Sequence, residues 1–166
     1  MERRPKRNGP GGERQQSEFD QKVVEVSRVT RVTGGGKRMR FRALVVIGDR
    51  KGRVGMGLRK GRDVAESVTK AVNHAKKNIL VIPLVDGTIP HETKVKYKAS
   101  ILVMRPAKPG TGVIAGGAVR QVAEMAGIKN MMSKMFGSSN KVNNIKAVFS
   151  GFRAMRSKEQ LAQKRK

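Results

Sequence analysis

The stretch that decides the fold runs Val26-Ser27-Arg28-Val29-Thr30-Arg31-Val32-Thr33-Gly34-Gly35-Gly36-Lys37-Arg38-Met39-Arg40-Phe41-Arg42. It holds six basic residues and no acidic one. Three of them, Arg38, Arg40 and Arg42, which we call the arginine row, alternate strictly with apolar residues. Alternation is the period of a β-strand, so Met39, Phe41 and Ala43 are predicted to face a core while the arginine row faces outward. Alternate side chains stand roughly 6.7 Å apart along a strand, a spacing that suits several phosphates.

A turn is predicted at Gly34–Gly36, between this strand and a preceding one. Val24, Val26, Val29 and Val32 outline the preceding strand, but their parity shifts between Val26 and Val29, where we expect a β-bulge. The plainer interpretation of the arginine row is an edge strand protected by charge. Three arginines without an interleaved acid exceed what such protection needs, so we favour a rigid hairpin that docks on a phosphate backbone.

Composition indicates a polyanionic partner. The 166 residues include 37 Lys and Arg against 12 Asp and Glu, a formal net charge of +25. Such self-repulsion weakens an isolated compact chain, so nucleic acid is the first candidate partner and an anionic membrane the second. No apolar run approaches the ~20 residues of a membrane span, so we expect no membrane partner. Aromatic residues make up 4%, which favours recognition of backbone and shape over base stacking.

Several kinds of chemistry are excluded by composition. The chain has no cysteine, which rules out disulfides and cysteine-ligated zinc. Its two histidines and scattered carboxylates are too few for a metal set or a catalytic carboxylate pair, so we expect no metal, no cofactor and no enzymatic activity. The N-terminus lacks the apolar region of a secretory signal, so we expect a cytoplasmic protein.

A third strand is predicted over 53–58. The preceding Asp49–Gly52 segment has Asp first and Gly last, as a type I turn prefers. Gly55 and Gly57 lie opposite the apolar face of this strand. Alternate glycines imply close approach of another backbone, which could belong to RNA or to a packed helix.

A helix is predicted to begin at Asp63, because Glu66 stands three residues later as in a capping box. Its apolar stripe consists of Val64, Val68, Ala71, Val72 and Ala75. Arg59, Lys60 and Arg62 come just before it, and with the helix's N-terminal amides they predict an anion site, most simply for a phosphate. The alternative is ordinary solvation of a helix start.

Together these elements predict a module of three antiparallel strands and one helix, which resembles the double-stranded-RNA-binding domain without its first helix. For the second half, the predicted elements are a buried, edge-like strand over 79–85, a turn at Asp86–Gly87, strands over 94–99 and 101–104, and helices over 119–126, 128–136 and 142–152. This order indicates a two-layer α/β domain. The fold class is therefore α+β. The predicted boundaries are a disordered basic arm over 1–18, the double-stranded-RNA-binding-like domain over 19–86, the α/β domain over 87–156, and a basic tail or helix over 157–166.

The glycines at 110, 112 and 116 follow a strand and open a helix, as in a phosphate-binding loop. Their spacing matches neither the dinucleotide fingerprint nor the Walker pattern, and no acidic residue follows at the distance needed to bind a ribose. We therefore interpret them as small residues that let a helix approach a sheet or a partner protein closely.

Four stretches resemble bacterial ribosomal protein five of the small subunit: Val29–Lys37, Gly48–Gly57, Pro106–Gly117 and Gly137–Asn140. The resemblance implies a left-handed crossover in the C-terminal domain, against the right-handed default. It implies binding to small-subunit ribosomal RNA where head meets body, beside the channel through which messenger RNA enters. It also implies contacts with small-subunit proteins four and eight, a location on the ribosome, and an influence on translational accuracy.

Carried over by position, Thr30 and Gly34–Lys37 form a loop that reaches toward the head, and Thr111, Gly112 and Arg120 lie at the contact with protein four. The chain departs from the family pattern at Gly34, where Lys is frequent, and at Arg50, where Gly is frequent. The residues expected to bind RNA are Arg28, Thr30, Arg31, Gly34, Gly35, Gly36, Lys37, Arg38, Arg40, Arg42, Arg50, Lys51, Arg53, Arg59, Lys60 and Arg62.

The leading functional prediction is a non-enzymatic, structural RNA-binding protein. The main alternative is an architectural protein that binds any free duplex RNA or DNA, with a steep salt dependence and no partner preference. A second alternative is an enzyme, an RNA helicase or a nucleotidase.

Overall fold

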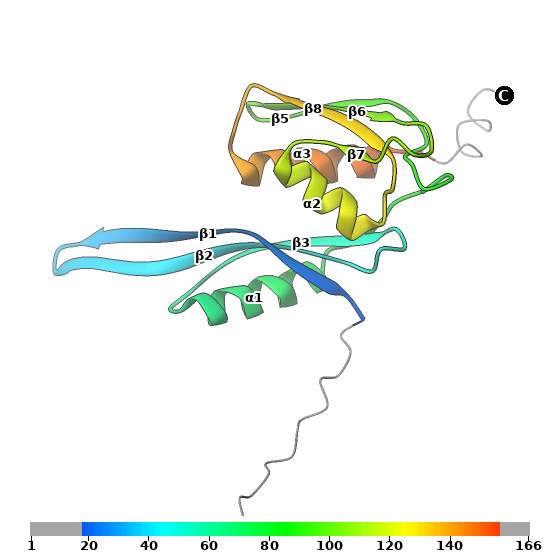
Figure 1. Cartoon of the computed structure of the whole chain (residues 1–166). Coiled ribbons are helices and arrows are strands. Elements are labelled where there is room, and N and C mark those ends of the chain that lie inside the picture. Colours follow the sequence, from blue (N-terminus) through cyan, green and yellow to red (C-terminus); the bar gives the residue numbers. More distant parts are fainter. Residues whose placement is uncertain (1–17, 157–166) are drawn as a thin grey trace, which may run out of the picture.

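Sheets and helices alternate in layers in the computed structural model, which describes residues 18–156 (Figure 1). The first sheet has the order β1-β2-β3-β4, from β1 (Asp20–Thr33), β2 (Gly36–Gly48), β3 (Arg53–Gly61) and β4 (Ile79–Val81), with α1 (Val64–Lys76) on one face. The second has the order β5-β6-β8-β7, from β5 (Thr93–Tyr97), β6 (Ser100–Pro106), β7 (Val113–Ile114) and β8 (Met131–Phe136), with α2 (Gly117–Ala126) and α3 (Lys141–Ala154) on one face. The α+β class is confirmed. The predicted tail, and the predicted arm apart from Glu18, lie outside the described residues.

The first sheet has four antiparallel strands, so the prediction of three is wrong. The extra strand, β4, is short and pairs only with Arg53–Gly55 of β3. The strand predicted over 79–85 is confirmed at the edge of the sheet over Ile79–Val81, but it is shorter than predicted and is not buried, because Ile79 and Val81 are exposed and the strand ends before Pro83. Ile82 alone in this segment is fully buried. The turn at Asp86–Gly87 is confirmed, since Val85 and Thr88 on either side of it exchange both backbone hydrogen bonds.

The backbone that lies close to the glycines of β3 belongs to α1. Of the two alternatives, RNA or a packed helix, the structure therefore shows the helix. A Cβ on Gly57 would stand 1.9 Å from the carbonyl oxygen of Ala71, and one on Gly55 would stand 2.6 Å from that of Ala75. On this face Ala43, Val45 and Ile47 of β2 pack against the same helix. Glycine is therefore needed on β3 for α1 to lie this close to the sheet.

Two local predictions about the first hairpin and the loop after it are wrong. The bulge in β1 lies between Val23 and Glu25, and the register runs without a shift through Val29. Val29 simply points to the outward face, opposite Arg40, so no bulge is required there. The segment after β2 is not a type I turn, because Arg50 has a φ of 57°, where that turn needs a negative value. A glycine would adopt this φ without strain.

The start of α1 differs in detail from a capping box. The side chain of Asp63 makes no capping hydrogen bond. Glu66 accepts from the amide of Arg62, one residue earlier than the box requires, and its other oxygen lies 2.6 Å from Nζ of Lys70. The hydrogen bond from Lys70 and that from the Arg62 amide together lower the pKa of Glu66 to about 2, from 4.5. Val64 is 37% exposed, so the apolar stripe packs against the sheet only from Val68 onward, with Ala71 and Ala75 fully buried.

We expect the Glu66→Gln variant to be less stable than the wild type near neutral pH but equally stable in acid. The folded-state pKa lies below 4.5, so the stabilisation is present above 4.5 and is lost as the pH falls toward about 2. Urea unfolding of both proteins between about pH 6 and about pH 2 measures this. A stability difference that stays constant across that range would contradict the prediction.

The second sheet is antiparallel except for β7 and β8, which pair in parallel and are joined by α2. Gly127 ends α2 in the left-handed conformation with a φ of 82°, as predicted. The helix predicted over 128–136 is wrong, because Met131–Phe136 forms β8. Met131 and Met135 face the core, but Met132 and Phe136 point outward and are half exposed. Apolar residues on both faces of the strand produced the spacing that resembled a helical stripe.

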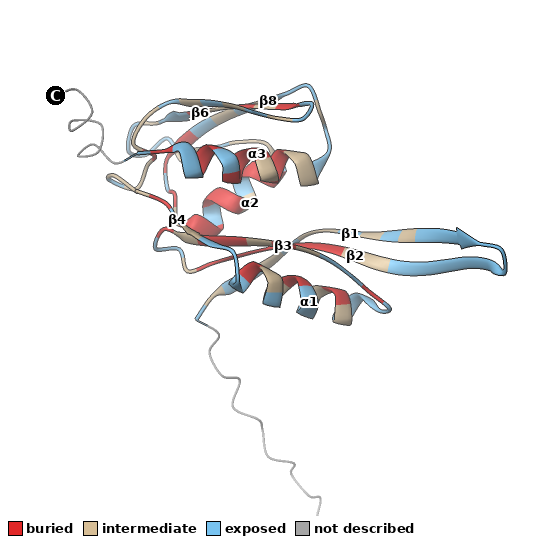
Figure 2. Ribbon diagram, turned by 180° about the vertical axis from the view of Figure 1, so that it is seen from behind, coloured by how far each residue is buried: buried red, intermediate tan, exposed pale blue. Residues whose placement is uncertain are grey.

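The two sheets share one apolar core, built around α2. Leu44, Val46 and Val54 of the first sheet pack in the same cluster as Val119 and Val122 of α2 (Figure 2). Within the described residues, no helix is both long enough and apolar enough to cross a membrane.

Hydrogen bonds also join the first sheet to α2. The amides of Arg50 and Gly52 donate to the last carbonyls of α2, those of Met125 and Ala126, at 3.1 and 2.9 Å. Lys22 of β1 and Glu124 of α2 form an ion pair at 2.9 Å. The loop between β2 and β3 therefore caps the C-terminal end of α2.

Candidate nucleic-acid interface

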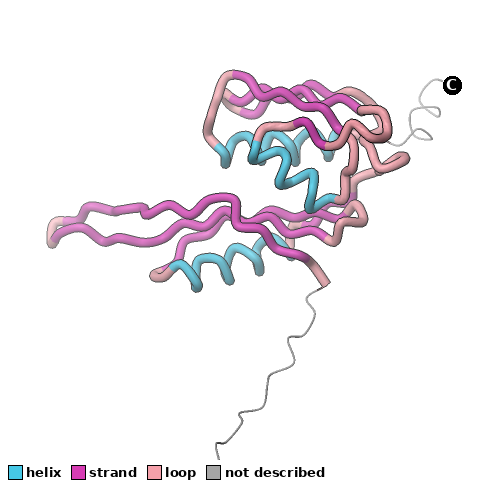
Figure 3. The backbone as a smooth tube through the Cα atoms, in the orientation of Figure 1, coloured by secondary structure: helices cyan, strands magenta, loops and turns pink. Residues whose placement is uncertain are grey.

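The outer half of the β1–β2 hairpin projects past α1 and the rest of the first sheet (Figure 3). β3 pairs with β2 only from Phe41 to Gly48, so beyond Phe41 the hairpin is two-stranded. Its turn is at the predicted glycines, and Gly36 has a φ of 125° that other residues rarely adopt. The predicted core face is buried only at Ala43; Phe41 is half-buried and Met39 is 55% exposed. α1 packs against β2 only from Ala43 onward, so nothing among the described residues covers Met39.

The arginine row lies on one face of the hairpin with two further cations. The register pairs Arg38 with Arg31 and Arg42 with Lys60. Directly paired residues of antiparallel strands share a face, so Arg31 and Lys60 extend the row. None of these five side chains forms an ion pair with a carboxylate of a described residue. The sheet therefore holds five unneutralised cations on one surface.

These cations border a shallow groove of about 570 Å³. Its lining residues are Val29, Thr30, Arg31, Thr33, Arg38, Arg40 and Lys60. Arg42 is half-buried beside it and donates to Oγ of Ser27 at 3.2 Å. Three arginines and one lysine are among the residues that line the groove, an arrangement suited to a strand of phosphates. We call it the arginine groove.

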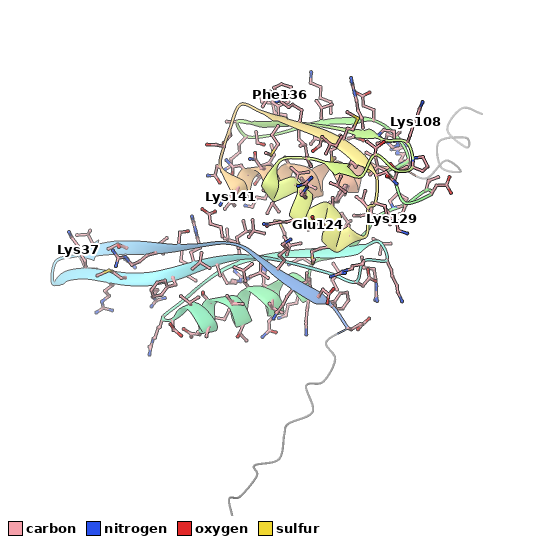
Figure 4. The ribbon with its side chains drawn as sticks, in the orientation of Figure 1. Lys37, Lys108, Glu124, Lys129, Phe136 and Lys141 are labelled. Carbon is pink, nitrogen blue, oxygen red and sulfur yellow. The ribbon has the colours of Figure 1, made fainter. Side chains whose placement is uncertain are left out.

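Arg28 and Lys37 lie on the opposite face of the hairpin. Arg28 pairs with Phe41, and Lys37, near the tip, pairs with Val32 (Figure 4). Thr30 pairs with Met39 on this face as well. The structure thus divides the predicted RNA-binding residues of the hairpin between two faces, with cations on each.

The predicted contacts at Arg50, Lys51 and Arg53 lie at the other end of β2, away from the arginine groove. Arg53 pairs with Asp49 at 2.6 Å and with Glu18 at 2.9 Å, and Arg50 pairs with Asp20 at 2.9 Å. Burial by itself raises the pKa of Asp49, but hydrogen bonds from the Arg53 side chain and from the amides of Lys51 and Arg53 outweigh it and leave that pKa below its ordinary value. These arginines hold the loop together and are partly neutralised.

Arg59, Lys60 and Arg62 occupy the end of β3 and the segment before α1, and all three are exposed. Lys60 shares the face of the arginine row, whereas Arg59 pairs with Ala43 and so lies on the α1 face. Because Glu66 accepts from the Arg62 amide and is itself ionised, this helix start already holds one negative charge. Lys60 is thus the residue of this group that the structure brings to the groove.

The residues predicted to meet a partner protein surround a loop that Asn130 holds in place. Oδ1 of the buried Asn130 accepts from the amides of Gly110 and Gly112, at 3.1 and 3.0 Å. Arg120 donates to the carbonyl of Val113 at 2.8 Å, and Thr111 is exposed at the tip. The sequence reasoning missed Asn130, because an isolated Asn between a helix and a strand carries no pattern.

We expect Asn130→Ala to release this loop. Two amides lose their acceptor, which costs about 1–3 kcal/mol of stability, and the Gly110 and Gly112 amides should exchange faster with solvent. Asn130→Asp keeps an acceptor oxygen and is the matched control. Hydrogen exchange measured by NMR checks both variants, and equal protection in the alanine variant would contradict the role of Asn130.

The outer face of the second sheet is uncovered and was also missed. Ile114 and Phe136 are each 50% exposed, and Met132 is 46% exposed. They border a depression of about 420 Å³, and no described helix lies over it (Figure 4). Lys94, Lys96 and Lys134 share this face. An uncovered apolar surface rimmed by charge is typical of a protein interface.

Comparisons with known proteins place both halves of the chain in one family. The family model for the N-terminal domain of ribosomal protein S5 matches residues 19–83, and that for its C-terminal domain matches residues 95–165. Small ribosomal subunit protein uS5 of Thermotoga petrophila is 45% identical over 139 residues, covering 84% of this chain and 78% of that protein. The uS5 protein of Chloroflexus aurantiacus is 45% identical over 148 residues, covering 89% and 83%. The protein uS5c of Spinacia oleracea is 48% identical over 148 residues, covering 89% and 48%.

Proposed function

Because the chain belongs to the ribosomal protein S5 family, we propose that it binds small-subunit ribosomal RNA at the junction of head and body, with the β1–β2 hairpin as the main contact. Its relatives are structural proteins of the small ribosomal subunit, so this chain is a non-enzymatic ribosomal protein that acts in translation. The helicase and nucleotidase alternatives are therefore abandoned. The cytoplasmic, ribosomal location expected from the sequence agrees with this membership.

The observation that carries the proposal is the arginine groove. Its cations have no carboxylate partner among the described residues, and the hairpin that bears them stands clear of the protein's own core. Counter-charges laid against such a surface relieve the repulsion among its cations, and folded RNA supplies them at a fixed spacing. Messenger RNA near the channel through which it enters is a further partner in the proposal.

A tethered cleavage experiment tests the location. The chain has no cysteine, so Gly35→Cys at the hairpin turn gives one attachment point for an iron chelate that cleaves nearby RNA. No atom lies within 4 Å of a Cβ at this position, so the variant should fold normally. We expect cleavage of small-subunit RNA where head meets body, and a different pattern from Lys129→Cys near the end of α2. Cleavage elsewhere in the subunit from Gly35→Cys would refute the location.

The second domain is proposed to contact protein neighbours. We assign the loop at Thr111 and Gly112, together with Arg120, to small-subunit protein four. We assign the outer face of the second sheet to protein eight, whose matching surface must carry an apolar centre and acidic groups to meet Lys94, Lys96 and Lys134. An influence on translational accuracy follows if the contact with protein four opens and closes as the subunit changes shape.

Phe136→Asp should abolish co-purification with protein eight and leave RNA binding unchanged. The substitution places a carboxylate at the centre of the apolar face, whose desolvation opposes docking. A pull-down with purified protein eight measures whether the variant still binds it. Lys98→Asp, which lies in the β5–β6 turn, is the control. Retention of protein eight by the Phe136→Asp variant would show that it docks elsewhere.

Two finer points of the fold belong to the same proposal. The first sheet and α1 would bind RNA as a double-stranded-RNA-binding domain does, through the shape of the backbone. The connection β7–α2–β8 would be the left-handed crossover that the resemblance implies. We also propose that the chain divides near Gly87 into domains over 19–86 and 87–156.

A further inference from the structure

A cleft separate from the arginine groove lies between α3 and the edge of the first sheet. β4 pairs with β3 only as far as Gly55, so the rest of that edge of β3 has no strand beside it among the described residues. α3 lies over β3 (Figure 2). The space between is about 400 Å³, with Met56, His74 and Asn78 on one side and Tyr97, Lys146 and Arg153 on the other. This volume falls within the range of pockets that accept small ligands.

The cleft combines an apolar floor with a cationic rim. Phe149 and Met56 contribute to the floor, and Tyr97 is half-buried beside them. Nζ of Lys146 stands 5.7 Å from the centre of the Tyr97 ring. Neither Lys146 nor Arg153 forms an ion pair with a described residue, and no carboxylate lines the cleft.

Polar groups able to make directional hydrogen bonds lie at the same place. Nδ1 of His74 is buried and has no hydrogen-bond partner among the described residues. The carboxamide of Asn78, whose nitrogen donates to the carbonyl of His74 at 3.1 Å, also lines the cleft, as does the hydroxyl of Ser150. A buried polar atom without a partner is costly, and a ligand that bonds to it removes that cost.

We propose that this cleft binds one unstacked nucleotide of RNA, with its base against Tyr97 and its phosphate on Lys146 and Arg153. An extruded base needs an aromatic or apolar surface, hydrogen-bonding groups at its edge and a cation for its phosphate, and the cleft supplies all three. Lys146, which now lies over the ring, moves outward onto the phosphate as the base enters. The low aromatic content of the chain is no obstacle, because a single nucleotide needs a single ring. This inference rests on the proposed RNA-binding function but concerns single-stranded RNA at a different surface.

The chain contains one tyrosine, so a fluorine label on tyrosine reports this cleft alone. We would replace tyrosine by 3-fluorotyrosine in the full chain and record its fluorine NMR signal during titration with a hexamer of uridine. The hexamer should shift the signal, whereas a blunt RNA duplex, which has no unstacked base to offer, should leave it in place. Absence of any shift at saturating hexamer would overturn the proposal.

Substitution separates the cleft from general attraction to a basic protein. Lys146→Ala with Arg153→Ala should weaken hexamer binding at least about tenfold. Lys94→Ala with Lys96→Ala removes the same charge from the outer face of the second sheet and should leave the affinity within about twofold. If the two double variants weakened hexamer binding equally, non-specific electrostatic attraction would explain that binding and the cleft would not. A variant with serine throughout the arginine row should bind ribosomal RNA about a hundredfold more weakly yet keep the hexamer-induced shift, so failure of the proposed function and failure of the cleft are distinguishable.

Discussion

Serine at Arg38, Arg40 and Arg42 together lowers the affinity for small-subunit ribosomal RNA by about a hundredfold, taking about 1 kcal/mol for each exposed charged contact. The row is exposed or half-buried and lacks carboxylate partners among the described residues, so its removal leaves no buried charge behind. The fold should be retained, because the side chains lie outside the apolar core.

Salt dependence gives a second, independent measure of the same change. Each phosphate contact contributes about 0.9 to the slope of log affinity against log salt, so the triple variant should lose about three from that slope. Filter binding with a ribosomal RNA fragment from about 50 to about 200 mM salt measures both quantities.

A matched control removes three lysines, Lys94, Lys96 and Lys134, from another strand surface, where the same charge surrounds a mainly apolar depression. It should leave the RNA affinity nearly unchanged. If the arginine-row variant kept the wild-type affinity, the arginine groove would have no part in RNA binding. If the wild-type protein bound a random duplex as tightly as the ribosomal RNA fragment, the architectural alternative would be favoured.

Alanine at Gly57 should cost about 3 kcal/mol or more of stability. The new Cβ would stand 1.9 Å from the carbonyl oxygen and 2.7 Å from the carbonyl carbon of Ala71. Both atoms belong to the backbone of α1, which cannot move aside without leaving the sheet. Ala71 and Ala75 are fully buried there, so the whole contact between α1 and the sheet is disturbed.

Thermal unfolding followed by circular dichroism should show a melting temperature lower by about 10 °C. Gly35→Ala is the control, since no atom lies within 4 Å of its Cβ and its backbone does not need glycine. If both variants melted together, α1 would not be held by this contact. RNA binding should fall in the Gly57 variant only where the first sheet has begun to unfold.

The hairpin could be predicted from the sequence because its information is local. Strict alternation, a glycine turn and the absence of acidic residues are all visible within Val26–Arg42. The limit of the buried face was not visible, because it depends on how far α1 reaches along the sheet. Met39 is apolar and alternates correctly, yet it is 55% exposed beyond the helix.

The errors arose where tertiary partners overrode a local pattern. β8 carries Met132 and Phe136 on its outer face, so its apolar spacing imitates a helix, and its pairing with β6 and β7 decides the outcome. Arg50 and Arg53 stay predicted RNA contacts, but charge alone did not show that acidic residues lie beside them. Asp20 and Glu18, distant in sequence, are their partners.

The cap that the β2–β3 loop places on the end of α2 has a mechanical consequence. Two backbone hydrogen bonds, the Lys22–Glu124 ion pair and a glycine at position 48 that leaves no room for a Cβ against Met125 fix the two halves of the chain at one angle. When a load is applied to the distal turn of the hairpin, we therefore expect the second sheet to keep its orientation to the inner part of the first sheet. Bending should be confined to the two-stranded part of the hairpin beyond Phe41.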